Sequence, residues 1–161
     1  MPKRILWASA TLVLVIAACG TTPGTSSTSP TAACANASAA HHAYLVVEHL
    51  SGTSFQDCVG FSGDSIDGQT LMDQSGVKYQ AQTFSFGKAV CQIDNEPAQY
   101  SQCFPQNQPF WALFVETGGA WAVSQTGYTQ VTLHDKEAMG WRYVGPNDAA
   151  SPPPPPLAKA S

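Results

Sequence analysis

The chain has 161 residues, a formal net charge of −4 at pH 7 and a sequence pI near 5.4. This length favours a single folded domain, and the acidic balance lacks the basic footprint that a nucleic-acid binder needs. Loss of Lys3 and Arg4 with a cleaved leader would make the chain more acidic still, which argues against adhesion to anionic lipid through charge. We therefore expect no nucleic-acid partner, and membrane attachment must use another route.

Residues 1–18 have the layout of an export signal. Lys3 and Arg4 precede an apolar segment of 14 residues, Ile5–Ala18, which is shorter than the ~20 residues that a membrane-spanning helix needs. The segment ends Ile16-Ala17-Ala18-Cys19, which resembles a bacterial lipobox; an ordinary signal peptide is the alternative. We predict a lipoprotein signal peptide, lipidation of Cys19, and anchoring on the extracytoplasmic face of the cell membrane.

Residues 19–42 form a segment of different composition. It is rich in Thr, Ser, Pro, Ala and Gly and has no charged residue, so it has too little apolar area to offset the entropy of ordering. We predict a flexible, lipidated tether. His41-His42 at its end does not predict a metal site, because adjacent side chains diverge and no third ligand is near.

Residues 43–145 carry the predicted domain. Ala43–Glu48 and Cys58–Phe61 have the composition of strands. After Gly63 the spacing of the apolar residues changes to that of a helix. Asp67 and Gly76 are the expected N-cap and C′ residue of a helix of about two turns. Its apolar stripe is expected to contain Ile66, Leu71, Met72 and Ser75.

The second half of the domain reads as strands joined by turns. The central feature is a predicted β-hairpin, Phe110–Ser124, with its turn at Gly118-Gly119. The other expected strands are Val77–Phe84, Ala89–Ile93, Val131–Leu133 and Gly140–Val144. About seven strands and one short helix predict an α+β domain with a mixed or antiparallel sheet.

Residues 146–161 form a Pro-rich tail. Five consecutive prolines, Pro152–Pro156, favour an extended polyproline II segment without backbone donors. In a eukaryote such a segment could be an SH3-type ligand; after a bacterial export signal, a stiff spacer is the favoured interpretation.

The cysteines fit an oxidising compartment. Besides Cys19 there are four, which allow three pairings. Cys91 and Cys103 flank one turn, and closing that loop would stabilise the fold by about 3 kcal/mol. The remaining pair is then Cys34 with Cys58. Zinc is the rival interpretation, but the chain has no C-x-x-C pair.

No catalytic constellation is predicted. Ser124, His134 and Asp135 are the residue types of a triad, but adjacent His and Asp cannot orient each other as a triad requires, and no nucleophile-elbow pattern surrounds the serine. The sequence also lacks a phosphate-binding glycine loop. We expect a protein that is not an enzyme and has no metal or cofactor.

Aromatic residues crowd between Phe110 and Tyr143. They are either the core of a small sheet or, in part, an exposed platform for a flat ligand or a partner. Strand periodicity alone does not decide which ones face outward, because a one-residue shift of register swaps the faces. The candidate ligand-binding residues are Trp111, Trp121, Tyr128 and Trp141.

Several short motifs occur in an order that resembles the transcobalamin-like C-terminal domain of bacterial surface proteins, in its cysteine-bearing actinobacterial type. They are Gly68–Gly76, Val90–Asp94, Phe110–Phe114, Gly118–Ser124 and Gly140–Tyr143. The resemblance implies a β-grasp-like fold and a non-catalytic accessory role at the cell surface.

Two functions follow as expectations. The first is a binding or adaptor module that helps the uptake of a corrinoid-like vitamin or another small solute. The alternative is a structural or adhesive envelope module that binds protein or glycan. Many bacterial members carry Asn-Gly where this chain has Glu116-Thr117-Gly118-Gly119, and the chain has no room for the second, helical domain with which the vitamin carriers hold cobalamin.

Overall fold

The computed structural model describes residues 34–149, 151–152 and 154–159. The expected signal peptide, Cys19 and most of the expected tether lie outside these residues. Within them, no helix is long and apolar enough to cross a membrane.

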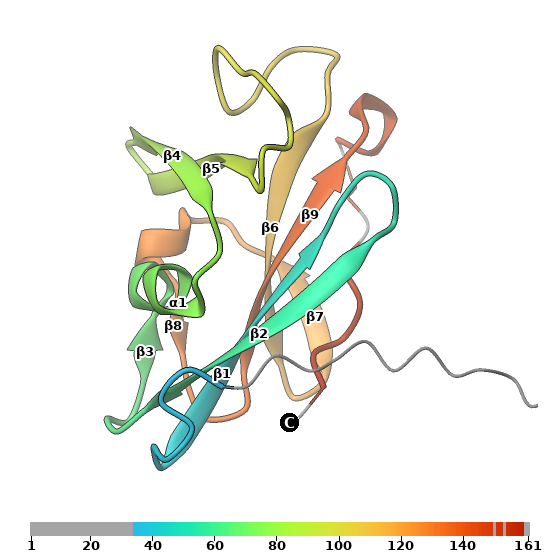
Figure 1. The fold of residues 1–161 in the computed structure, drawn as a ribbon. Helices are drawn as coiled ribbons and strands as arrows, with labels where there is room; N and C mark the ends of the chain where they lie inside the picture. The colour runs from blue at the N-terminus through green and yellow to red at the C-terminus, as the bar shows by residue number, and fades with distance from the viewer. Residues whose placement is uncertain (1–33, 150, 153, 160–161) are drawn as a thin grey trace, which may run out of the picture.

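The centre of the fold is a five-stranded sheet (Figure 1). Its order is β2 (Ser54–Phe61), β1 (His41–Glu48), β9 (Ala138–Val144), β6 (Phe110–Thr117) and β7 (Ala120–Val123). β1 and β9 are parallel neighbours and the other pairs are antiparallel, so the sheet is mixed. Within the described residues one α-helix accompanies the sheets, which agrees with the expected α+β class.

Two small antiparallel sheets complete the strands. β4 (Tyr79–Phe84) pairs with β5 (Gly87–Ile93), and β3 (Ile66–Asp67) pairs with β8 (Thr132–Leu133). Two 3₁₀ turns occupy Tyr128–Gln130 and Pro146–Asp148. β3 was not expected: Ile66 belongs to this strand and pairs with Leu133, so its assignment to the helical stripe was wrong.

Helix α1 (Gly68–Ser75) begins and ends where the sequence predicted. The Asp67 carboxylate accepts a hydrogen bond from the Thr70 backbone N–H at 2.9 Å, which satisfies one of the free donors at the helix start. Gly76 has φ of 82°, a left-handed conformation that glycine adopts without steric cost. Each cap depends only on residues within or next to the helix, which is why the sequence predicted both ends.

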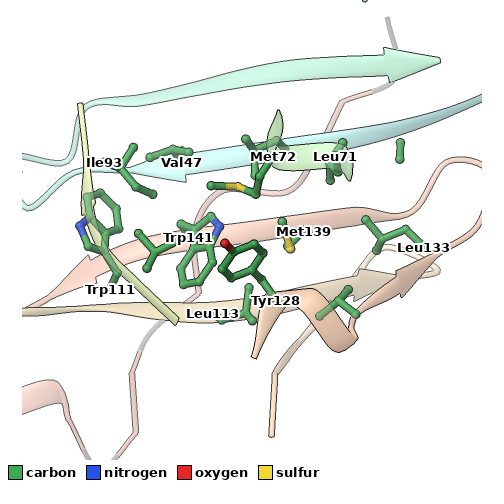
Figure 2. Close-up of a cluster of buried hydrophobic side chains, with 14 of the residues drawn as sticks. Val47, Leu71, Met72, Ile93, Trp111, Leu113, Tyr128, Leu133, Met139 and Trp141 are labelled. Carbon is green, nitrogen blue, oxygen red and sulfur yellow. The ribbon is translucent and has the colours of Figure 1, made fainter. Parts of the chain in front are cut away.

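The main core lies between α1 and the facing side of the sheet. Leu71 and Met72 of the helix are fully buried there, as predicted, and Figure 2 shows Met72 in one cluster with Val47, Tyr128 and Trp141. Along β6, Trp111 and Leu113 point into this core, whereas Ala112 and Phe114 belong to a separate cluster on the opposite face. We call the α1 side the inner face of the sheet and the opposite side the outer face.

The predicted hairpin is formed by β6 and β7. Gly118 and Gly119 have φ of 62° and 81°, which two-residue turns of this kind require and glycine supplies. Pairing with β7 covers only Phe114–Thr117 of β6, because β7 is shorter. The first half of β6 is therefore bordered by β9 but not by β7.

The structure contains two disulfides, Cys34–Cys58 and Cys91–Cys103, which is the pairing that the spacing favoured. The first ties the chain ahead of β1 to β2. The second closes the loop that leads from β5 toward β6.

The tail differs from the spacer that the sequence favoured. Residues 154–159 lie against the outer face of the sheet, and Pro155 is buried. In Figure 1 this segment, coloured red, returns alongside the sheet on the side away from α1.

Candidate ligand-binding cleft

A cleft of about 520 Å³ opens beside the first half of β6. One wall comes from β5, the turn before it and the loop that follows it, and the other from the segment after β7. Trp111, Leu113 and Trp141 contribute to its lining from the sheet. The cleft exists because β7 ends before it reaches the start of β6 and, among the strands that the structure describes, no other one pairs with that edge.

The walls carry large apolar side chains that are exposed to solvent. Phe86 is 38% exposed, Phe104 44% and Val123 43%, and all three line the cleft. Among the described residues only Leu50 and Leu157 are other large hydrophobic side chains this exposed. Exposed apolar side chains gathered in one concavity indicate a binding surface more strongly than scattered ones do.

Ring contacts hold the aromatic wall in place. Phe84 and Phe86 stack with ring centroids 5.1 Å apart and planes 7° apart. The Phe104 ring lies between those of Phe86 and Phe110, with its centroid 6.2 Å from the first and 5.9 Å from the second. Because Cys103 is disulfide-bonded to Cys91, the backbone beside Phe104 is tied to β5. The aromatic wall is therefore supported by the β4–β5 hairpin, by β6 and by the Cys91–Cys103 disulfide.

The edge of β6 adds backbone hydrogen-bonding groups to the cleft. The Ser124 N–H donates to the Leu113 carbonyl at 2.9 Å, so the polar groups of Leu113 point toward this edge. In an antiparallel ladder these groups alternate in direction along a strand, so those of Trp111 point to the same edge, beyond the end of β7. A ligand can meet both an apolar wall and a polar strand edge.

Lys88 is the only charged residue in the described lining of the cleft. Its Nζ donates to the Gln69 Oε1 atom at 3.1 Å, and the Gln69 amide donates to Asp73 at 2.9 Å and to the Tyr79 hydroxyl at 2.7 Å. The Tyr128 hydroxyl also donates to Gln69 Oε1, at 3.3 Å. This network connects the cleft wall to α1 and orients the single ammonium group.

The two tyrosines of this network stay protonated. Burial, and the hydrogen bond that Tyr79 donates to Asp73, raise the pKa of Tyr79 well above its ordinary value. Burial also raises the pKa of Tyr128. The phenols therefore act as neutral hydrogen-bond donors.

The four candidate aromatic residues do not form one platform. Trp111 and Trp141 are each 2% exposed and Tyr128 is 1% exposed, all in the inner core. The Trp111 Nε1 atom donates to the Glu96 carbonyl at 2.8 Å. Trp121 lies on the outer face, edge-on to Phe114. Trp111 of β6 and Trp141 of β9 line the cleft on the side of the sheet. Trp121 and Tyr128 are absent from its described lining.

Phe86, Phe104 and Val123 make the exposed part of the cleft, and none of them was predicted from the sequence. These residues come from three separate segments, and no periodic pattern relates them. The Cys91–Cys103 spacing was the one usable signal, because it predicted that the residue after Cys103 lies near β5.

The residues considered for a triad have other partners. The Ser124 hydroxyl donates to the Thr126 carbonyl at 2.9 Å, and the His134 Nδ1 atom lies 3.0 Å from the Asp64 carbonyl. The Asp135 carboxylate accepts from the His42 backbone N–H at 2.9 Å, which lowers its pKa. In the part of the chain that the structure describes, no three His, Cys, Asp or Glu side chains gather as metal ligands.

Comparisons with known proteins give little further information. No protein-family model and no curated protein matches the chain. Among solved structures, the chain is similar to a "putative metal binding protein" from Ruminococcus gnavus, with a TM-score of 0.48 and 15% identity. The match covers 65% of this chain and 97% of that one. A likeness this distant is no basis for assigning an activity.

Proposed function

We propose that this chain is an extracytoplasmic lipoprotein, anchored through Cys19, whose folded domain is a non-catalytic module that binds a small ligand in the cleft beside β6. The observation that carries the proposal is the exposure of Phe86, Phe104 and Val123 within one concavity. Keeping three large apolar side chains in contact with water is unfavourable unless a ligand covers them.

The lining indicates the chemical class of the ligand. Stacked phenylalanines favour a flat apolar surface, and Lys88 together with the β6 edge favours a group that carries negative charge or accepts hydrogen bonds. The cleft volume is that of an ordinary small-molecule site. A corrinoid would lie against the wall with one face and leave the other accessible, as suits a module that passes its ligand to another protein.

A β-grasp-like fold belongs to the same proposal. The strand order β2-β1-β9-β6-β7, with parallel β1 and β9 at its centre and α1 packed across one face, supports it. In this arrangement the helix fills the inner face and the tail covers the outer face, which leaves an edge of the sheet for a small ligand. The cleft lies at such an edge.

Binding of cyanocobalamin and dicyanocobinamide to the full-length protein in detergent tests this proposal. We expect saturable quenching of tryptophan fluorescence by at least one of them, because Trp111 and Trp141 border the cleft. The double variant Phe86→Ala/Phe104→Ala should bind at least tenfold more weakly. Leu50→Ala is the matched control, since Leu50 is also exposed but does not line the cleft. Equal affinity in the double variant would place the ligand elsewhere, and no binding would exclude the corrinoid class.

The unpaired edge of β6 favours one alternative, an envelope module that captures an extended peptide. Such a peptide would add a strand beside Phe110–Leu113 through main-chain hydrogen bonds. N-methylation of alternate peptide residues should then abolish binding, because it removes the donors that the strand edge requires.

A further inference from the structure

The outer face of the sheet holds the tail through hydrogen bonds from three strands. The Arg142 guanidinium donates to the Pro154 carbonyl at 2.7 Å, and the Glu116 carboxylate accepts from the Ala158 N–H at 2.8 Å. The Gln56 side chain forms two bonds with Lys159: it accepts from the N–H at 2.7 Å and donates to the carbonyl at 2.6 Å. The tail is therefore docked between Pro154 and Lys159.

Apolar contacts accompany these bonds. Ala158 and Trp121 both pack against the outer-face cluster that contains Tyr44 and Ala138. Gly140 leaves a notch in β9: a Cβ there would lie 2.7 Å from the Trp121 ring and 2.8 Å from Pro155 Cγ. The indole and the proline ring therefore fill space that any other residue at position 140 would occupy.

These contacts recognise a type of segment and not one sequence. Every tail atom in the four hydrogen bonds belongs to the main chain, and the buried side chain is a proline ring. Aromatic grooves with main-chain hydrogen bonds are a general mode of polyproline II recognition, since that conformation is rigid before binding. Any extended proline-rich segment offers the same groups.

The tail leaves one donor of this surface unused. The Trp121 Nε1 atom is buried and has no hydrogen-bond partner among the described residues. Buried indole N–H groups usually have a partner. A segment that placed a carbonyl oxygen at this atom would form a bond that the tail does not.

We propose that the outer face of the sheet is a docking surface for a proline-rich extended segment of a partner protein, and that the chain's own tail occupies this surface as an intramolecular competitor. The surface consists of Gln56, Glu116, Trp121, Gly140 and Arg142. It adjoins the cleft but contains neither Phe86 nor Phe104, and it does not depend on the small-ligand proposal.

Competition follows from how the tail is connected. Strand β9 ends at Val144 and the first tail contact is at Pro154, so a short connector keeps the tail near its site. Short linkers give effective concentrations in the millimolar range. An external segment therefore binds the intact chain weakly, unless it also uses Trp121 Nε1.

The test uses full-length protein in detergent and a fluorescein-labelled peptide with the sequence of residues 151–161. The tail variant Pro154→Ser/Pro155→Ser/Pro156→Ser weakens the internal occupant without changing the sheet. By fluorescence anisotropy it should bind the peptide at least tenfold more tightly than the wild type does. A peptide with all five prolines replaced by serine is the control and should not bind.

Two further substitutions in the tail variant locate the site. Gln56→Ala removes two hydrogen bonds to the main chain of the bound segment from a half-buried position. It should weaken peptide binding about fivefold, which corresponds to about 1 kcal/mol in total. Leu50→Ala removes an exposed apolar side chain that belongs neither to this surface nor to the cleft, and it should leave peptide binding unchanged.

Three results would overturn the proposal. The tail variant could keep its melting temperature and still bind the peptide no better than the wild type, which would make the tail an internal strap only. The tail variant could bind the residue 151–161 peptide and its serine-substituted control equally, which would mean that the surface does not recognise proline. Lastly, the wild type could be a dimer that the tail variant loses, in which case the surface serves a second copy of this chain.

Discussion

At the scale of single residues, the tryptophans show how one sheet separates a core from a surface. Trp111 and Trp141 lie on the inner face, where Trp141 is paired with Leu113 across β6 and β9. Trp121 is paired with Glu116 and joins the outer-face clusters. Trp111 and Trp141 are therefore core residues, whereas the chemically identical Trp121 belongs to a surface.

Alanine substitutions should distinguish these roles. Trp141→Ala removes a fully buried indole and should lower the free energy of unfolding by ~3 to 5 kcal/mol. Trp121→Ala should cost only about 1 to 2 kcal/mol, because the residue is partly exposed and its ring lies beside the tail over Gly140. Urea melts of the two variants measure the difference, and equal losses would contradict it.

Tyr79 should make the protein less stable at high pH. Its pKa is raised by burial and by its hydrogen bond to Asp73, so the folded chain keeps a proton that the unfolded chain releases. The resulting stabilisation is complete below the unfolded pKa of about 10 and is lost as the pH rises beyond it. Urea melts from about pH 8 to about pH 11 should show this decline, and Tyr79→Phe should reduce its slope. An unchanged slope in the variant would assign the decline to Tyr128 and Tyr143, whose pKa values burial also raises.

At the scale of elements, the sequence predicted what neighbouring residues determine. Asp67 and Gly76 determine the two ends of α1, and Gly118-Gly119 determines the turn of the hairpin. Each of these signals involves only residues that are close together in the chain. The short strand at Ile66 was missed because only its distant partner, Leu133, makes it a strand.

The cleft and the docked tail were missed for the same reason. Phe86, Phe104 and Val123 meet only when β4–β5, the disulfide loop and β7 have been placed. Pro155 meets Gly140 and Trp121 only when the outer face exists. Sites assembled from separate segments leave no periodic signal in one sequence.

Removal of the Cys91–Cys103 disulfide should affect both stability and the cleft. The double variant Cys91→Ala/Cys103→Ala loses a covalent link and should unfold about 2 to 5 kcal/mol more easily. Because the link positions Phe104, ligand binding in the cleft should weaken as well. Cys34→Ala/Cys58→Ala is the matched control: it should also lower stability but leave the cleft ligand bound. Equal effects of both pairs on binding would contradict a positioning role.

At the scale of the whole molecule, one sheet presents three different surfaces. The inner face is closed by α1, the edge beside β6 is open as the cleft, and the outer face is covered by the tail. Ser151 and Pro152 of the tail also line the cleft, so the two surfaces adjoin. The segment before β1 connects the domain to the proposed anchor. The Cys34–Cys58 disulfide attaches this segment to β2.

The anchor itself can be separated from the fold. Cys19→Ser removes the sulfur that the lipid would modify, so the protein should move from the detergent phase to the aqueous phase in Triton X-114 partitioning. The domain should stay folded, because its described contacts begin at Cys34, and its melting temperature should match that of the wild type. Cys34→Ser is the matched control, since it should lower the melting temperature through loss of the first disulfide but remain in the detergent phase. If Cys19→Ser partitions like the wild type, the chain is not held by a lipid at this cysteine, and the anchoring part of the proposed function is wrong while the cleft remains to be tested.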